Sequence, residues 1–196
     1  MTVLPDSLEE ELEQFIGRRV AEGFDSEEDI VEGALEYFEH DFPGDNLPEV
    51  AARLTEEAIK KHLDNEKTWI NSTDCDKLDV VFDQLEGEGI VARQNFTCCQ
   101  TCGHCEIWEE VEQTRQERPV SGYVFYHQQD TERACDEGIL YLAYGATDNT
   151  DEAAIKVARR ATEVCQNNGF KVDWNGSLDK RICLVNFDWR RRRRNA

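Results

Sequence analysis

The sequence contains no long hydrophobic run, and this absence removes one class of protein. No stretch approaches the roughly 20 apolar residues that a membrane-spanning helix needs. The first residues also offer neither the basic segment nor the apolar segment of an export signal. We therefore expect a soluble cytoplasmic protein whose eight cysteines stay reduced. Reduced cysteines serve as metal ligands, catalytic groups or core residues rather than as structural disulfides.

Basic residues are also scarce. Lysine and arginine number 22 against 42 acidic residues, and the net charge is −20. An acidic body repels phosphate backbones, so we expect it not to bind nucleic acid. One exception is local, because five consecutive arginines occupy residues 190–194. We expect this run to dock on the protein's own acidic surface or to stay solvated rather than to bind nucleic acid.

The chain has no internal repeat and no long linker, and its periodicity divides it into two parts. Residues 1–68 predict a three-helix unit, because their apolar side chains recur at helical spacing. The first of these stripes consists of Leu8, Leu12, Phe15, Ile16 and Val20. Ser26 and Asp29 are typical of the start of the second helix, where each can bond the other's backbone. Residues 69–196 form the second part.

The second part predicts an α+β domain. Helices are expected at about 75–85, just after the densest cysteines, and at about 154–165. Strands are expected at about 90–96, 123–127, 139–144, 170–174 and 181–189. This order indicates a mainly antiparallel sheet covered by helices, ferredoxin-like or related to it.

Half of the cysteines lie in one eight-residue segment that also contains His104, and they are Cys98, Cys99, Cys102 and Cys105. A Cys-x-x-Cys pair is half of a zinc site, but the sequence has no second pair of that spacing to complete it. Iron–sulfur patterns are also incomplete, because Glu109 stands where the fourth ligand of a ferredoxin run would fall. Of the other cysteines, Cys75, Cys165 and Cys183 fall on apolar faces and are expected in the core.

A thiol-reactive interpretation has its own physical basis. Cys102 and Cys105 are expected where a helix begins, and the positive end of a helix dipole stabilises a thiolate. The same helix carries several glutamates, which would raise the pKa of thiols that they face. The two effects oppose each other, so the sequence leaves the reactivity open.

A second polar segment follows the apolar strand predicted at 123–127. It contains His127 and Asp130, and a histidine beside acids is a candidate base or ligand. The alternative is a loop in which Asp130 or Thr131 caps a short helix through Ala134. If the strand after Gly122 lies beside the strand before Cys98, His127 would approach the thiols.

The sequence resembles a family of bacterial proteins known only as a domain of unknown function. The resemblance covers about residues 70–194 and rests on four strings: residues 95–103 (NFTCCQTCG), 122–132 (GYVFYHQQDTE), 140–145 (LYLAYG) and 189–191 (WRR). It implies no activity. It does imply that Cys98, Cys99 and Cys102 belong to the family's motif, that Cys105 is peculiar to this chain, and that the arginines belong to the last strand.

Three functions remain open. An acidic α+β protein without a complete catalytic set favours a non-enzymatic binding or regulatory module with a protein partner, in which the cysteine-rich turn is structural. The second function is a zinc-binding module that uses Cys98, Cys99 and Cys102, with His127, His104 or a distant cysteine completing the site. The third is a thiol enzyme or redox sensor that uses Cys98, Cys99 or Cys102 with His127 and Asp130.

Overall fold

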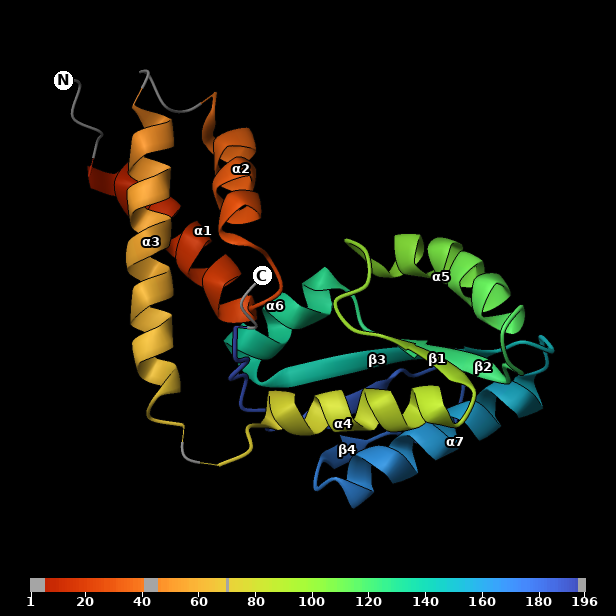
Figure 1. Ribbon diagram of the computed structural model, residues 1–196. Coiled ribbons are helices and arrows are strands. Elements are labelled where there is room, and N and C mark those ends of the chain that lie inside the picture. The colour runs from red at the N-terminus through yellow and green to blue at the C-terminus, as the bar shows by residue number, and fades with distance from the viewer. Residues whose placement is uncertain (1–5, 41–45, 70, 194–196) are drawn as a thin grey trace. The chain divides into compact units, whose positions relative to one another are not determined.

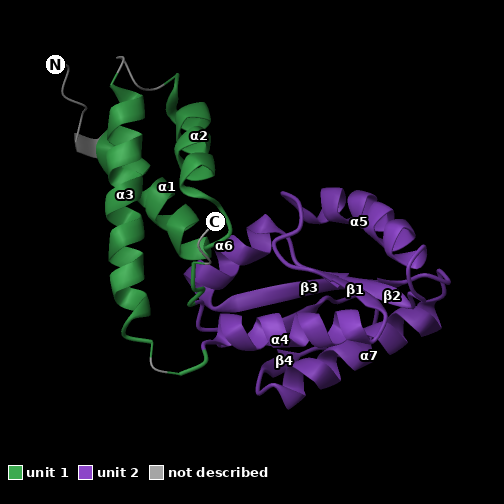
Figure 2. Ribbon diagram, in the orientation of Figure 1, with its two compact units in different colours: residues 1–72, 190–196 green, residues 73–189 purple. Residues whose placement is uncertain are grey.

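The computed structural model describes residues 6–40, 46–69 and 71–193, and the chain divides into two compact units (Figure 2). The first unit comprises residues 1–72 and 190–196, and the second comprises residues 73–189. The sequence pattern predicts a boundary near residue 68 and a C-terminal end that belongs wholly to the second part. In the structure, the last described residues return to the first unit.

The first unit consists of three helices, α1 (Asp6–Glu22), α2 (Glu27–Phe38) and α3 (Leu47–Glu66) (Figure 1). The predicted stripes form its core, whose fully buried members include Leu12, Ile16, Ile30, Ala34 and Ala51. Helix α2 begins with the expected reciprocal bonds, in which the Ser26 hydroxyl accepts from the Asp29 amide and the Asp29 carboxylate accepts from the Ser26 amide.

The arginine run packs into this helical unit. The family resemblance implied that it belongs to the last strand, and this prediction is wrong. Arg191 is only 7 % exposed, and its guanidinium lies 4.3 Å from the centre of the Phe24 ring. The ring of His62 lies 2.9 Å from the Arg191 carbonyl oxygen. Arg192 donates to the carbonyl of Trp69 at 3.0 Å. The expectation of self-docking is thus met for residues 191–193. Arg190 is exposed, and Arg194 lies outside the described residues.

The second unit is a five-stranded sheet with four helices. Its elements are α4 (Asp74–Gly87), β1 (Ile90–Arg93), α5 (Gln100–Arg115), β2 (Gly122–Phe125), α6 (Gln128–Glu137), β3 (Ile139–Ala146), α7 (Asp151–Asn167), β4 (Lys171–Asp173) and β5 (Ile182–Val185). The strand order is β1-β2-β3-β5-β4, and every pairing except the parallel β1–β2 pair is antiparallel. The predicted α+β class with a mainly antiparallel sheet is confirmed.

The parallel pairing of β1 and β2 brings the segments that follow the two strands together. Strand β1, helix α5 and strand β2 form a β–α–β unit in which Arg93 is the register partner of Phe125. The carboxyl ends of both strands therefore meet at one edge of the sheet, and α5 and α6 both begin there. Figure 1 shows α5 on one face of the sheet and α4 and α7 on the other. A core that includes Val91, Ile107 and Phe125 fixes α5 on its face.

Two expected elements differ from the structure, in addition to the start of α5 described below. The last strand ends at Val185 rather than at Trp189, because its partner β3 begins at Ile139, opposite Val185. The short helix after β2 exists, but its N-cap is His127, one turn earlier than the caps considered from the sequence. Among the described residues, none of the helices combines the length and the apolar character needed to cross a bilayer.

Candidate functional site

The turn between β1 and α5 is braced by hydrogen bonds that do not use a cysteine side chain. Asn95 and Thr97 adopt positive φ angles of 49° and 59°, which is strained for a β-branched threonine. The amide of Phe96 donates to the carbonyl of Tyr126 at 2.8 Å, and the amide of Gln128 donates to the carbonyl of Thr97 at 3.1 Å. The turn is therefore held against the start of α6 by hydrogen bonds.

Helix α5 begins earlier than the sequence suggested, and this changes which cysteine occupies its end. Cys99 is the N-cap, with an extended backbone (φ −153°, ψ 170°), and Cys102 lies on the first turn of the helix. Cys105 lies a further turn along and is exposed. The position with the strongest influence of the helix dipole thus belongs to Cys99 rather than to Cys102 or Cys105.

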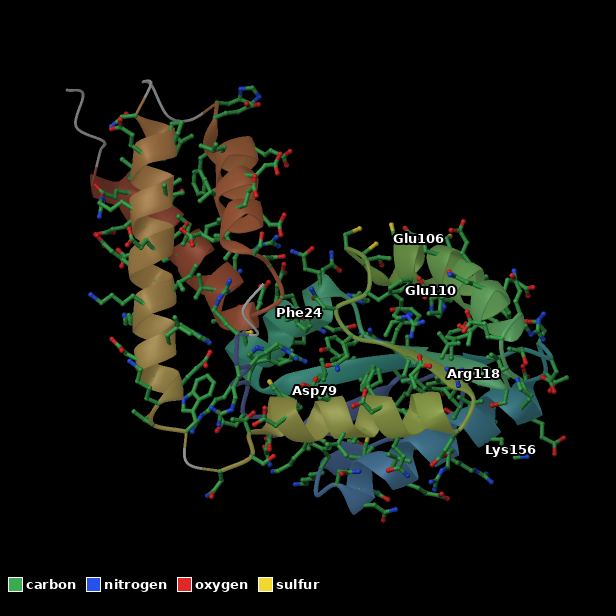
Figure 3. All side chains as sticks on the ribbon, viewed as in Figure 1. Phe24, Asp79, Glu106, Glu110, Arg118 and Lys156 are labelled. Atoms are coloured by element: carbon green, nitrogen blue, oxygen red, sulfur yellow. The ribbon has the colours of Figure 1, made fainter. Side chains whose placement is uncertain are left out.

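Cys98, Cys99 and Cys102 form what we call the thiol cluster. Their sulfur atoms all lie within 4.8 Å of one another, and the Sγ atoms of Cys98 and Cys102 are 3.6 Å apart. Cys98 is exposed and the other two are partly exposed. Figure 3 shows yellow sulfur atoms projecting from the turn that leads into α5. The cluster is accessible to reagents and ligands from solvent.

The environment separates the acidities of the thiols. The backbone amide of Cys102, together with the thiols of Cys102 and Cys98, stabilises the Cys99 thiolate and lowers the pKa of Cys99. The pKa of Cys102 rises to about 12, because its thiol bonds to Cys98 and Cys99 favour the protonated form. Glu110 does not oppose this arrangement, since Arg93 donates two hydrogen bonds to it at 2.8 and 2.9 Å.

His127 and Asp130 reach the same edge of the sheet as the thiol cluster but do not join it. The His127 Nε2 atom lies 3.0 Å from an Asp130 oxygen, and both side chains are almost fully buried. Arg181 donates to both oxygens of Asp130 at 2.8 and 3.0 Å. Within the described part of the chain, the residues whose ligand atoms lie close enough to share a metal ion are Cys98, Cys99 and Cys102, without a histidine or a carboxylate.

Arg181 is a residue of this site that no pattern in the sequence indicated. The residue directly precedes strand β5 and lies more than 50 positions from its partner Asp130, so no local pattern connects the two. Its guanidinium also lies 4.8 Å from the centre of the Tyr141 ring. Its position at the start of the strand predicted at 181–189 does not indicate a partner in α6.

His104 belongs to the face of α5 that packs on the sheet. Its Nδ1 atom lies 3.4 Å from the Tyr123 hydroxyl, and burial, reinforced by the charge of Arg181, lowers its pKa. The expected core cysteines are confirmed, since Cys75, Cys165 and Cys183 are all buried. Burial raises the pKa of the Cys165 thiol to about 12.

Comparison with known proteins gives a family but no activity. A family model described as a domain of unknown function (DUF6891) matches residues 5–193. No curated protein and no solved structure matches the chain. The match extends beyond the region of resemblance noted in the sequence, because it includes the N-terminal helices as well as the α+β unit. The chain therefore belongs to the DUF6891 family.

Proposed function

We propose that this protein is a thiol–disulfide redox protein whose working groups are Cys99 and Cys102. The position of the thiol cluster carries the proposal: three accessible sulfurs lie within 4.8 Å of one another at the N-terminus of α5. A Cys-x-x-Cys pair at the start of the crossover helix of a β–α–β unit favours a reactive thiolate beside a second thiol.

The two cysteines have different roles. The thiolate is the form that attacks a disulfide, and the helix N-terminus favours it at Cys99, the cysteine whose pKa is lowered. Cys102 remains protonated until a mixed disulfide forms at Cys99, and then it attacks that sulfur. Cys99 and Cys102 are the N-cap and the third residue of α5, and their sulfur atoms lie within 4.8 Å of each other. A small adjustment of the first turn brings their Cβ atoms to the roughly 3.5–4.5 Å of a disulfide.

The surroundings of the cluster support chemistry over a bracing role. The turn is held by the backbone bonds of Phe96 and Gln128 and by the Thr131 hydroxyl, which donates to the Asn95 side chain at 2.8 Å. Exposed thiols bury little surface, so they add little to the stability of this turn. Strained backbone at Thr97 directly precedes the cluster, and such strain is common at functional sites.

His127 and Asp130 do not act as the general base in this proposal. The imidazole of His127 and the carboxylate of Asp130 are engaged with each other and with Arg181. The helix end and the neighbouring thiols activate Cys99 instead. His127 and Asp130 position the start of α6 and hold Arg181.

A second candidate function is metal binding, which the sulfur geometry also favours. Zinc–sulfur bonds of about 2.3 Å place the sulfurs of a tetrahedral site about 3.8 Å apart, and Cys98 and Cys102 are 3.6 Å apart. Such a site would hold zinc with three thiolates and one exchangeable position, because neither His127 nor His104 belongs to the group of possible ligands.

One experiment separates the two functions. Protein purified without a metal-affinity tag is analysed for metals, treated with a mild excess of a small disulfide, and mapped by mass spectrometry. A redox protein contains no stoichiometric metal, loses two thiols, forms a Cys99–Cys102 disulfide and stays the same size. Cys102→Ser should accumulate a mixed disulfide at Cys99, whereas Cys99→Ser should form neither product.

Cys105→Ser is the matched control. Cys105 is exposed on the same helix but lies outside the thiol cluster, so its replacement should leave the Cys99–Cys102 disulfide unchanged. About one equivalent of zinc, whose removal unblocks three thiols, would establish the metal site instead. Cluster thiols that stay reduced in metal-free protein would rule out both functions.

A further inference from the structure

A pocket of about 420 Å³ adjoins the thiol cluster within the α+β unit. Its volume falls in the range of sites for small ligands, about 300–1,000 Å³. Tyr141 of β3, Cys183 of β5 and the β4–β5 connection line it, and Gln100 of α5 completes one wall. No step proposed above for the thiol cluster uses this pocket.

Gln100 connects the pocket to the cluster. It directly follows Cys99 in the chain, so the two Cα atoms are about 3.8 Å apart. A ligand of one to three amino-acid residues spans up to about 10 Å when extended. The pocket thus includes the residue next to Cys99 in the chain, and a ligand of this length is long enough to extend past Gln100.

The pocket carries both signs of charge. Asp173 and Asp179 supply carboxylates, and Lys180 and Arg181 supply an ammonium and a guanidinium group. Arg181 is held in place by its two bonds to Asp130, which is only 1 % exposed. A ligand with one ammonium and one carboxylate group complements this lining, and a singly charged ligand leaves one pair of side chains without a counterpart.

We propose that this pocket binds the zwitterionic end of a low-molecular-weight disulfide of the cystine or peptide-disulfide type and presents its sulfur to Cys99. The proposal rests on the redox function proposed above. The ligand's carboxylate meets Lys180 and Arg181, and its ammonium meets Asp173 and Asp179. Because these groups orient the ligand, disulfides that carry both charges should react with Cys99 faster than other disulfides.

The chemical step balances with this disulfide as the oxidant. The Cys99 thiolate attacks one ligand sulfur, a Cys99–ligand S–S bond forms, and the other half of the ligand leaves as a thiolate. Cys102 passes its proton to that thiolate and attacks the Cys99 sulfur. The Cys99–Cys102 disulfide forms and the second half leaves, so two protein thiols are oxidised and one small disulfide is reduced to two thiols.

The test compares two net-neutral disulfides. Each half of cystine carries one ammonium and one carboxylate, whereas hydroxyethyl disulfide carries no charge. The double variant Asp179→Asn with Lys180→Gln removes one charge of each sign from exposed positions and keeps the net charge. Cystine should oxidise Cys99 of this variant about tenfold more slowly than Cys99 of the parent, the effect expected for the loss of charge-assisted hydrogen bonds. The variant's rate with hydroxyethyl disulfide should not change.

The control double variant is Glu112→Gln with Arg115→Gln, an exposed ion pair near the far end of α5. It should react like the parent with both disulfides. If the pocket variant reacts with cystine at the parent's rate, or loses rate equally with both disulfides, the pocket proposal is wrong while the redox function stands. If the parent's Cys99 reacts with neither disulfide, the redox function itself fails.

Discussion

At the scale of single residues, Gly103 sets how closely α5 lies on the sheet. A Cβ atom at this position would come within 2.4 Å of the Phe125 ring, far inside normal contact distance. Gly103 directly follows Cys102, so the approach that it permits also places the thiol cluster at the edge of the sheet. The packing of Gly103 against Phe125 therefore helps to determine where the thiol cluster lies.

We expect Gly103→Ala to destabilise the α+β unit. Alanine gains up to about 1 kcal/mol of helix propensity, but overpacking costs about 1–3 kcal/mol because the ring or the helix must move. Urea unfolding should show a net loss of about 1 kcal/mol, and the rate of Cys99 with a thiol reagent should change. Gly33→Ala in α2 is the control, since nothing lies within 4 Å of its new Cβ atom; it should stabilise slightly. Unchanged stability and reactivity of Gly103→Ala would contradict this account.

At the scale of elements, the sequence predicts helices better than strand ends. Helix α4 begins where Thr73 and Asp76 bond each other's backbone, and such caps are local signals. A strand ends where its partner ends, and the partner of β5 is distant in sequence. Phe187 continues the apolar alternation, but its amide bonds to the carbonyl of Gly138 outside the strand ladder. The cysteines of the site lie close together in the sequence, so the sequence identifies them. Asp130 and Arg181 lie far apart in the sequence, so it does not identify their pair.

A surface ion pair joins two helices of the α+β unit and predicts a pH dependence. Arg160 of α7 donates to both oxygens of Glu88, the C-cap of α4, at 2.6 and 2.7 Å. These bonds lower the pKa of Glu88 from 4.5 to about 2. Because the folded-state pKa is depressed, the pair stabilises the fold above pH 4.5, and this contribution disappears as the pH falls toward 2.

Glu88→Gln should therefore lower the free energy of unfolding at neutral pH by at most about 1 kcal/mol, since the pair is solvent-exposed. The difference from the parent should shrink as the pH falls from 4.5 toward 2, when measured by urea unfolding at several pH values. Asp83→Asn removes another exposed carboxylate of α4 and serves as the control. A parent–variant difference that stays constant through the acid range would show that the pair does not act as described.

At the scale of the whole molecule, the helical unit is built from two distant parts of the chain. Arg193 adds to the contacts of Arg191 and Arg192, because its amide donates to the Glu66 carboxylate at 2.7 Å and its guanidinium donates to the Asp25 carbonyl at 2.8 Å. Most of these contacts are to carbonyl oxygens and an aromatic ring rather than to carboxylates. Salt screens such contacts less than it screens surface ion pairs.

We expect Arg191→Gln to destabilise the helical unit by about 2 kcal/mol, because a buried cation over an aromatic ring is lost. Urea unfolding at low and high salt should give nearly the same loss. Arg53→Gln is the control: Arg53 forms exposed pairs with Glu9 and Glu57, so its small effect should decrease with salt. Salt-sensitive binding of DNA or RNA by the parent, lost in Arg191→Gln without loss of stability, would contradict the docked role of the arginines.

Because residues 190–193 belong to the same unit as the first three helices, they also affect the order in which the two units fold during synthesis. The ribosome completes α3 on the order of ten seconds before it reaches these arginines, at usual rates of synthesis. During that interval Phe24 lacks the guanidinium that covers it in the finished chain. The α+β unit, whose residues are contiguous, can fold first, and the N-terminal helices reach their final form last. A chain that stops before residue 190 therefore contains all three N-terminal helices but lacks the contacts that complete their unit.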